Sequence, residues 1–245
     1  MIDPQSLALM ALAIGAGAFV KGVTGAGLPV IAVPVLAIFF GVPQSIAVMV
    51  VPVLLTNAWQ LVEYRAARAE AGFLPWMLAA AVPGIIAGTW LLAELPERHL
   101  SMGLGAIVVC YIVLQLAHPS FSVSGPLARR LAPLAGFVAG GLQGSTGISA
   151  PVSVTFLHAL RLSREAYIFA LSALFLVFST TQIPALSFAG FLTWQVFLEG
   201  LLAIVPAVAM LPVGSFVGRQ IRREIFDKIV LVLLATIAVK LLFGG

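Results

Sequence analysis

Two glycine-rich stretches hold the residues of this chain that are best suited to chemistry. Residues 21–29 read KGVTGAGLP, and residues 141–151 read GLQGSTGISAP. Each stretch interrupts apolar sequence, and its glycines and proline break a helix, which leaves backbone N–H and C=O groups without helical partners. Inside a membrane such groups are tolerated only where protein buries them or a wet cavity solvates them. Two matching breaks, one in each half of the chain, therefore indicate a transporter's binding site.

The chemistry that these breaks favour is the binding of an anion. A helix that begins after a break presents free N–H groups and the positive end of its dipole, and glycine lets a ligand approach the backbone. Lys21 adds a positive charge directly before the first break. If Lys21 lies inside the membrane, its charge is costly to hold there and indicates a functional site. The predicted substrate-binding residues are Lys21, Gly22, Thr24, Gly25, Gly27, Asn57, Gln60, Gln143, Gly144, Ser145, Thr146, Gly147 and Ser149.

Structural roles without a ligand also fit these residues. The glycines can serve only to let helices pack closely. Lys21 can extend to the cytoplasmic surface if the first hairpin crosses the membrane fully. Asn57 and Gln60, with residues 180–182 at similar places in the second half, can form hydrogen bonds between helices instead of lining a cavity.

Glu199 is a candidate for proton coupling. It lies well inside the apolar run 190–214, and a carboxyl group at such a depth is rarely ionised unless it is paired. A salt bridge or a wet pocket is the alternative interpretation of its position.

The composition predicts an all-α, polytopic membrane protein with a single membrane domain. The chain has 245 residues, of which 61% are hydrophobic and 9% are charged, with a mean hydropathy of +1.13. Soluble domains carry about 25% charged residues. The formal net charge of +4 comes from basic residues placed singly or in pairs between apolar runs. It therefore indicates membrane orientation, and no nucleic-acid partner is expected.

The sequence predicts no enzyme, no cofactor and no metal site. Cys110 is the only cysteine, so neither a disulfide within the chain nor a metal-ligand cluster is expected. The sequence contains no Walker loop, no HExxH and no GxSxG motif.

Ten apolar runs define the expected helices. A full crossing needs roughly 20 residues, a length that six runs reach or nearly reach: 42–62, 73–93, 100–117, 166–186, 190–214 and 225–243. The four runs that flank the breaks are shorter: 5–20, 28–40, 131–143 and 147–160. They predict half-helices in two hairpins, which either cross thinly or re-enter to the middle of the membrane.

The chain is expected to be an internal repeat. An offset of 119 residues places Gly17, Gly22 and Gly25 on Gly136, Gly141 and Gly144. Each half then consists of a hairpin and three helices, with repeat one at about 1–117, a linker at about 118–130 and repeat two at about 131–245.

The loop charges predict that the two repeats are inverted. If each hairpin counts as two crossings or returns to its starting side, one side holds only Arg98 and Lys240. The other side holds Arg65, Arg68, Arg129, Arg130, Arg161, Arg164, Arg219, Arg222, Arg223 and Lys228. Because basic loops stay in the cytoplasm, both termini should be periplasmic.

Three features of the chain together resemble the sulfite exporter TauE/SafE family. They are the two glycine stretches, the Val33-Pro34-Val35-Leu36 segment after the first stretch, and the repeat of a hairpin plus three helices. This family is also called the 4-toluene sulfonate uptake permease family. The resemblance covers nearly the whole chain. It implies a secondary transporter of the bacterial inner membrane for anions such as sulfite, sulfoacetate or aryl sulfonates. Family motifs often run through consecutive glycines, whereas here 26–29 read AGLP and 146–149 read TGIS, which leaves the substrate open.

The expected function is alternating-access transport of an organosulfonate or sulfite, with coupling to protons through Glu199 left open. The alternatives are a passive anion channel and a permease for a non-sulfur organic anion. The expected partners are a small anion and the lipid bilayer, and a homodimer is compatible with the sequence.

Overall fold

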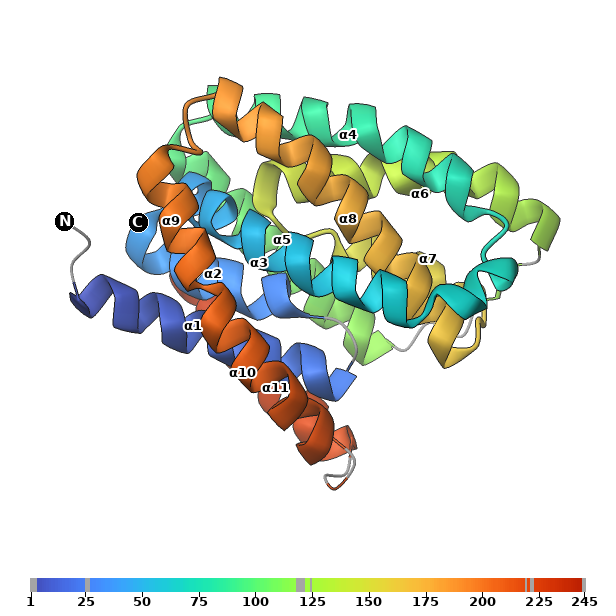
Figure 1. Ribbon diagram of the computed structural model, residues 1–245. Helices are drawn as coiled ribbons and strands as arrows, with labels where there is room; N and C mark the ends of the chain where they lie inside the picture. Colours follow the sequence, from blue (N-terminus) through green and yellow to red (C-terminus); the bar gives the residue numbers. More distant parts are fainter. Residues whose placement is uncertain are drawn as a thin grey trace.

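The computed structural model is built of helices (Figure 1) and describes residues 4–24, 27–117, 122–123, 125–218, 220 and 223–243. In the first half α1 (Pro4–Thr24), α2 (Leu28–Phe40) and α3 (Val42–Glu63) are followed by a short 3₁₀ helix, η1 (Arg65–Glu70), then α4 (Leu74–Glu94) and α5 (Glu97–Ala117). The second half contains α6 (Gly125–Thr146), α7 (Ala150–Ala159), α8 (Arg164–Phe188), α9 (Trp194–Leu202), α10 (Ile204–Val217) and α11 (Arg223–Phe243). The described residues contain no strand, which confirms the all-α fold class.

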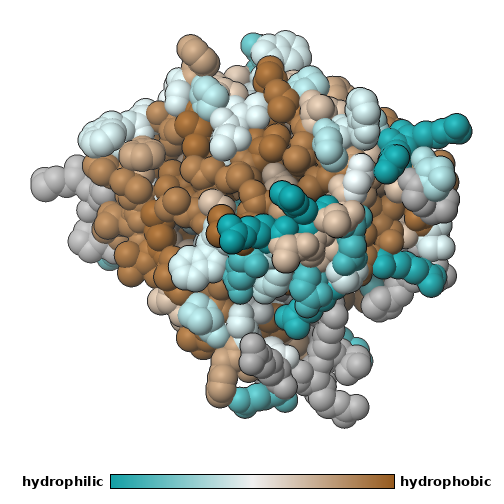
Figure 2. Space-filling model, turned by 45° about the vertical axis from the view of Figure 1, so that its right-hand side comes forward, coloured by the Kyte–Doolittle hydropathy of each residue, from teal (hydrophilic) through white to brown (hydrophobic). Residues whose placement is uncertain are grey.

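Within the part of the chain that the structure describes, six segments are long and apolar enough to cross a membrane. They are Gln5–Thr24, Val42–Glu63, Leu74–Glu94, Glu97–Ala117, Arg164–Phe188 and Trp194–Val217, whereas α2 and α7 are shorter apolar helices. Large apolar side chains such as Trp59, Trp90 and Phe216 are exposed on the outside. Figure 2 shows a broad hydrophobic surface with hydrophilic residues gathered towards one side. A lipid environment explains this surface, because a soluble monomer rarely exposes so much contiguous apolar area.

The expectation of four half-helices is wrong for the first helix of each hairpin. α1 has 21 residues and α6 has 22, whereas α2 has 13 and α7 has 10. The glycines near the ends of α1 and α6 do not stop these helices, because neighbouring helices pack against them. α6 also begins inside the linker expected at 118–130, of which residues 118–121 and 124 lie outside the described residues.

The expected single helix at 190–214 is instead divided into α9 and α10 at Ala203. Pro206 lies in the first turn of α10 and has no N–H to donate to the carbonyl of Leu202. Proline interrupts a helix for this reason and because its ring clashes with that carbonyl.

Two close-packed helix pairs lie at opposite edges of the molecule, α4 with α6 and α1 with α10 (Figure 1). A Cβ atom at Gly84, Gly88 or Gly136 would overlap a backbone carbonyl oxygen of the partner helix. Gly22 and Gly214 are in the same situation in the other pair. Small residues let membrane helices approach to backbone contact, and they do so here along both pairs. α3 and α8 pack against each other between them.

The hairpins of the two halves have equivalent contacts at an offset of 122 residues, nearly one helical turn more than the expected 119, whereas their contact partners on α4 and α10 are 126 residues apart. A Cβ at Gly22 would meet the backbone of Leu211 and Ser215, and a Cβ at Gly144 would meet the backbone of Ile85 and Thr89 in the same way. The starts of α2 and α7, and of α3 and α8, differ by the same 122 residues. Each stretch contains glycines three residues apart, so the glycines can be aligned at an offset of 119 residues as well as at 122. Glycine spacing alone therefore does not decide the register.

Replacing Gly88 by alanine should disrupt the contact between α4 and α6. The new methyl group would overlap the carbonyl oxygen of Gly141, and overpacking of this kind costs typically about 1–3 kcal/mol. Thermal unfolding of the purified protein in detergent measures the loss. Gly103→Ala is the matched control, because a Cβ there meets no atom within 4 Å. Equal stability of the two variants would show that the α4–α6 contact is loose.

Candidate functional site

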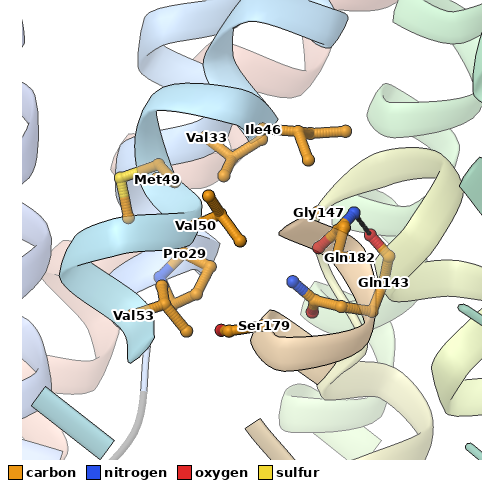
Figure 3. Close-up of a pocket in the computed structure, with 10 residues that line it drawn as sticks. All are labelled: Pro29, Val33, Ile46, Met49, Val50, Val53, Gln143, Gly147, Ser179 and Gln182. Carbon is orange, nitrogen blue, oxygen red and sulfur yellow. Dashed lines mark hydrogen bonds between the residues drawn. The ribbon is translucent and has the colours of Figure 1, made fainter. Parts of the chain in front are cut away.

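A small cavity lies between the two hairpin breaks, where the two halves meet (Figure 3). Its lining residues are Pro29 and Val33 of α2, Ile46, Met49, Val50 and Val53 of α3, Gln143 of α6, Gly147 of the second break, and Ser179 and Gln182 of α8. Its volume of about 10 Å³ gives room for about one water molecule. The conformation is therefore closed around this point.

The cavity has two chemically different walls. All six lining residues from the first half are apolar, and all four from the second half are either polar or glycine. Figure 3 shows the apolar side chains of α2 and α3 facing Gln143, Ser179 and Gln182 across the cavity. Such a cavity suits a ligand with a polar group on one side and an apolar body on the other.

Gln143 provides an incompletely bonded polar group on the polar wall. Its side chain is 5% exposed, and its Oε1 has no hydrogen-bond partner among the described residues. Its carboxamide extends from α6 into the cavity (Figure 3). A buried acceptor without a partner costs about 1–3 kcal/mol, so this oxygen is suited to accept a hydrogen bond from a water molecule or from a donor group of a ligand.

Gln182 and Gly147 fix the second break in place. Gln182 Nε2 donates to the backbone oxygens of Gln143 and Gly144, both at 3.4 Å, which joins the end of α6 to α8. Gly147 has φ 72°, and its N–H donates to the Gln143 carbonyl at 2.8 Å. Glycine adopts this left-handed conformation without strain, and a Cβ there would press on Val33 and Ile46.

Lys21 is buried and bonded to two neutral side chains of α3. It is 4% exposed, and its Nζ donates to Thr56 Oγ1 at 3.2 Å and to Asn57 Oδ1 at 3.0 Å. Within the described residues no carboxylate lies within ion-pair distance of this amine. The structure thus contradicts the interpretation that Lys21 extends to the surface. An ammonium group has three donors, and these two bonds leave one for a ligand.

The Lys21 cluster lies one helical turn from the cavity. Asn57 Nδ2 donates to the carbonyl of Val53 at 2.7 Å, and the side chain of Val53 lines the cavity. Four residues of α-helix rise about 6 Å. Lys21 therefore does not line the cavity in this conformation, although it lies near it.

The remaining predicted site residues have local roles in this conformation. Gly22 and Gly144 are used for close packing against α10 and α4, which supports the helix-packing interpretation of these two glycines. The hydroxyl groups of Thr24, Ser145 and Thr146 donate to carbonyls one turn earlier in their own helices. Ser149 shares a hydrogen bond with Ser153, Gly27 has φ 112°, and Gln60 accepts from Ser172 at 3.4 Å. Gly25 lies outside the described residues.

The two short helices offer fewer N–H groups than the sequence suggested. Neither α2 nor α7 has a side-chain cap at its N-terminus, so the first amides are not bonded by an N-cap side chain. Proline at positions 29 and 151 removes one N–H from each first turn.

Glu199 is buried against α3, away from the lining residues of the cavity. It is 3% exposed and accepts from Gln44 Nε2 at 3.3 Å and from Gln195 Nε2 at 3.1 Å. Neither oxygen has an ion-pair partner among the described residues. The alternative interpretation of a salt bridge finds no support in the described part of the chain.

Ser179 and the apolar wall are the parts of the site that sequence reasoning missed. The 122-residue offset would have found Ser179, because it pairs Ser179 with Asn57 and Gln182 with Gln60. Valines and isoleucines in membrane helices carry no such signal, since the same residues face lipid elsewhere.

Comparison with known proteins gives one finding. The family model described as sulfite exporter TauE/SafE matches residues 9–241, nearly the whole chain. No curated protein and no solved structure gives a significant match.

Lys21 and Asn57 should be energetically coupled. Asn57→Leu leaves the buried amine short of an acceptor, at a cost of about 1–3 kcal/mol, whereas adding Lys21→Met removes the group that needs the acceptor. Thermal unfolding of both single variants and the double variant should therefore show a double-variant cost smaller than the sum.

The matched control combines Lys21→Met with Thr180→Val, because the Thr180 hydroxyl is exposed and donates only within α8. These two costs should add. Additive costs for Lys21 and Asn57 as well would contradict the buried contact.

Proposed function

The chain belongs to the sulfite exporter TauE/SafE family, a family of membrane transporters, and from this premise we propose that it carries small sulfur-containing anions across the membrane by alternating access. The family membership places the chain among transporters and not among enzymes. The substrate within this class and the mechanism are the subject of the proposal.

The observation that carries the proposal is the buried amine of Lys21. It lies in an apolar helix, and its bonds to the described residues go to the neutral acceptors Thr56 and Asn57. A buried charge is costly unless a partner compensates it, and a substrate anion would be such a partner. Gln143 lies on the opposite helix hairpin and lines the cavity near Lys21, and its amide N–H groups would add neutral donors for an anion in the cavity.

The small size of the cavity supports alternating access. The space between the breaks holds about one water molecule in this conformation, so a substrate fits there only after the surrounding helices move. The glycine-packed pairs α1–α10 and α4–α6 can move as rigid units against the central α3 and α8. Binding at the repeat interface with movement of one unit against the rest is the usual arrangement of such transporters.

The two-walled cavity favours an organosulfonate over sulfite within the sulfur anions. The three oxygens of a sulfonate group match the polar wall of Gln143, Ser179 and Gln182. An organic body of a few carbon atoms matches the valines of α2 and α3, and each buried CH₂ contributes about 0.8 kcal/mol. A non-sulfur organic anion is the remaining alternative for the same walls.

We propose further that the repeats are inverted and that both termini are periplasmic, in the bacterial inner membrane. The support is the distribution of basic residues together with their exposure. The exposed arginines include Arg65 and Arg68 in η1, Arg129 in the second turn of α6, Arg161 before α8 and Arg164 at its start. Exposed arginines at these helix ends fit a cytoplasmic surface.

Binding to the purified protein tests the proposed function. Calorimetric titration should detect methanesulfonate and benzenesulfonate, with sulfite weaker. Lys21→Met should weaken sulfonate binding by about ten- to a hundredfold, because a hydrogen bond to a charged group contributes about 1.5–3 kcal/mol.

Lys240→Met is the control for the loss of a lysine, because Lys240 lies near the end of α11 over the ring of Phe39. Equal sulfonate affinities of wild type and Lys21→Met would contradict the role of Lys21. The absence of binding for every sulfur anion would contradict the function.

Proton coupling through Glu199 is a separate part of the proposal. Glu199→Gln keeps a polar side chain beside Gln44 and Gln195 but cannot exchange a proton. Sulfonate uptake into proteoliposomes should lose its dependence on an imposed pH gradient, while sulfonate binding stays within about threefold of wild type, a difference of under 1 kcal/mol. Glu94→Gln, at the exposed end of α4, is the control. Gradient-driven uptake by Glu199→Gln would limit Glu199 to a structural role.

A further inference from the structure

We infer that the chain contains a second anion subsite, formed by Lys21, Asn57, Gln60 and Ser172, which is the repeat-related equivalent of the cavity at Gln143, Ser179 and Gln182. This inference rests on the proposed function. It adds that the substrate occupies two positions in the transport cycle, one formed around each break.

The first step is the equivalence of the two sets of residues. At the 122-residue offset, Gln143 corresponds to Lys21, Ser179 to Asn57 and Gln182 to Gln60. The three polar residues of the cavity wall thus match three polar residues of the first half. The offset itself comes from packing, because Gly22 and Gly144 contact the same kinds of backbone atoms in α10 and α4.

The rest of the cavity lining also has counterparts, with identical residues at four of the ten positions. The identical pairs are Pro29 with Pro151, Ile46 with Ile168, Gly147 with Gly25, and Gln182 with Gln60. The remaining apolar wall residues Val33, Met49, Val50 and Val53 correspond to Thr155, Leu171, Ser172 and Phe175. The second subsite therefore has a more polar opposite wall than the cavity.

The second step is the state of these residues in the structure. The donors and acceptors of the second subsite are bonded to one another, since Lys21 donates to Asn57 and Ser172 donates to Gln60. Ser172 lies on α8 and Gln60 on α3, so this contact joins the two halves. At the cavity Gln182 has no corresponding hydrogen bond, because the residue equivalent to Ser172 is Val50, which has no hydroxyl group. The polar groups of the second subsite are therefore bonded to one another here, while its equivalent retains a small space.

The third step is the consequence for transport. Inverted repeats exchange conformations between the two access states, so the half that is closed in one state adopts the open arrangement in the other. Opening the second subsite separates Ser172 from Gln60 and frees donors of Lys21 and Ser172 for a sulfonate. Because the amine of Lys21 can carry a positive charge and the amide of Gln143 cannot, the anion should bind more tightly on the side of Lys21.

Cysteine reporters at the equivalent positions 50 and 172 test the inference. The background is Cys110→Ser, since Cys110 is the only cysteine, and the reporters are Val50→Cys and Ser172→Cys. Each is treated with a membrane-impermeant anionic thiosulfonate in right-side-out and inside-out vesicles. Val50→Cys should react from one face and Ser172→Cys from the opposite face. Methanesulfonate at ten times its Kd should slow both reactions by about tenfold, as expected for a binding site that must be empty to react.

Two controls keep the result interpretable. Glu94→Cys in the Cys110→Ser background places a reporter at the exposed end of α4, outside the residues of both subsites, so methanesulfonate should not change its labelling. Gln60→Cys and Gln182→Cys form a second equivalent pair, which replaces the first pair if Ser172→Cys fails to fold.

The outcomes separate this inference from the proposed function. Slowing at position 50 alone would overturn the second subsite and leave sulfonate transport intact. Reaction of both reporters from the same face, or no reaction at positions 172 and 60 from either face, would also overturn it. If methanesulfonate slows the reaction of neither reporter and the purified protein binds no sulfur anion, the proposed function itself is overturned.

Discussion

The constraint on which this structure depends is that a polar group inside a membrane must find its partner within the protein. The second helix break exposes backbone groups, and the surrounding helices cover them. Gln182 of α8 donates to the carbonyls at the end of α6, and a Cβ at Gly147 would press on Val33 and Ile46 of the first half. This break is therefore held in place by α8 and by the first half.

The same constraint explains the properties of Lys21. Water cannot reach its amine, and Thr56 and Asn57 offer oxygen dipoles without a negative charge. Such an arrangement satisfies hydrogen bonds but offers no negative charge to compensate a protonated amine. It is a reasonable resting state for a site that exchanges its partner, because a carboxylate at this place would compete with the substrate anion.

Close packing supports this arrangement by making rigid units. Glycines on α4 and α6, and on α1 and α10, bring backbones into contact, so neither pair can slide without a clash. The polar residues of the two halves lie at equivalent positions on these units and on the central helices. An internal repeat can thus produce two related sites from one pattern of residues, and single substitutions such as lysine for glutamine then make the two sites chemically different.

The sequence by itself determined the all-α membrane fold, the two breaks and most helix positions. These follow from hydrophobicity and from glycine and proline, which act through neighbours in the chain. Only the tertiary structure decided that Gly22 and Gly144 face helices and not a ligand, that Lys21 is buried, and that the register of the repeat is 122 residues. A glycine has the same local effect whether a helix or a ligand approaches it, and a lysine has the same helix position whether its amine reaches water or Asn57. The physical difference lies in contacts between residues far apart in the chain, such as Lys21 with Asn57 and Gly144 with Ile85.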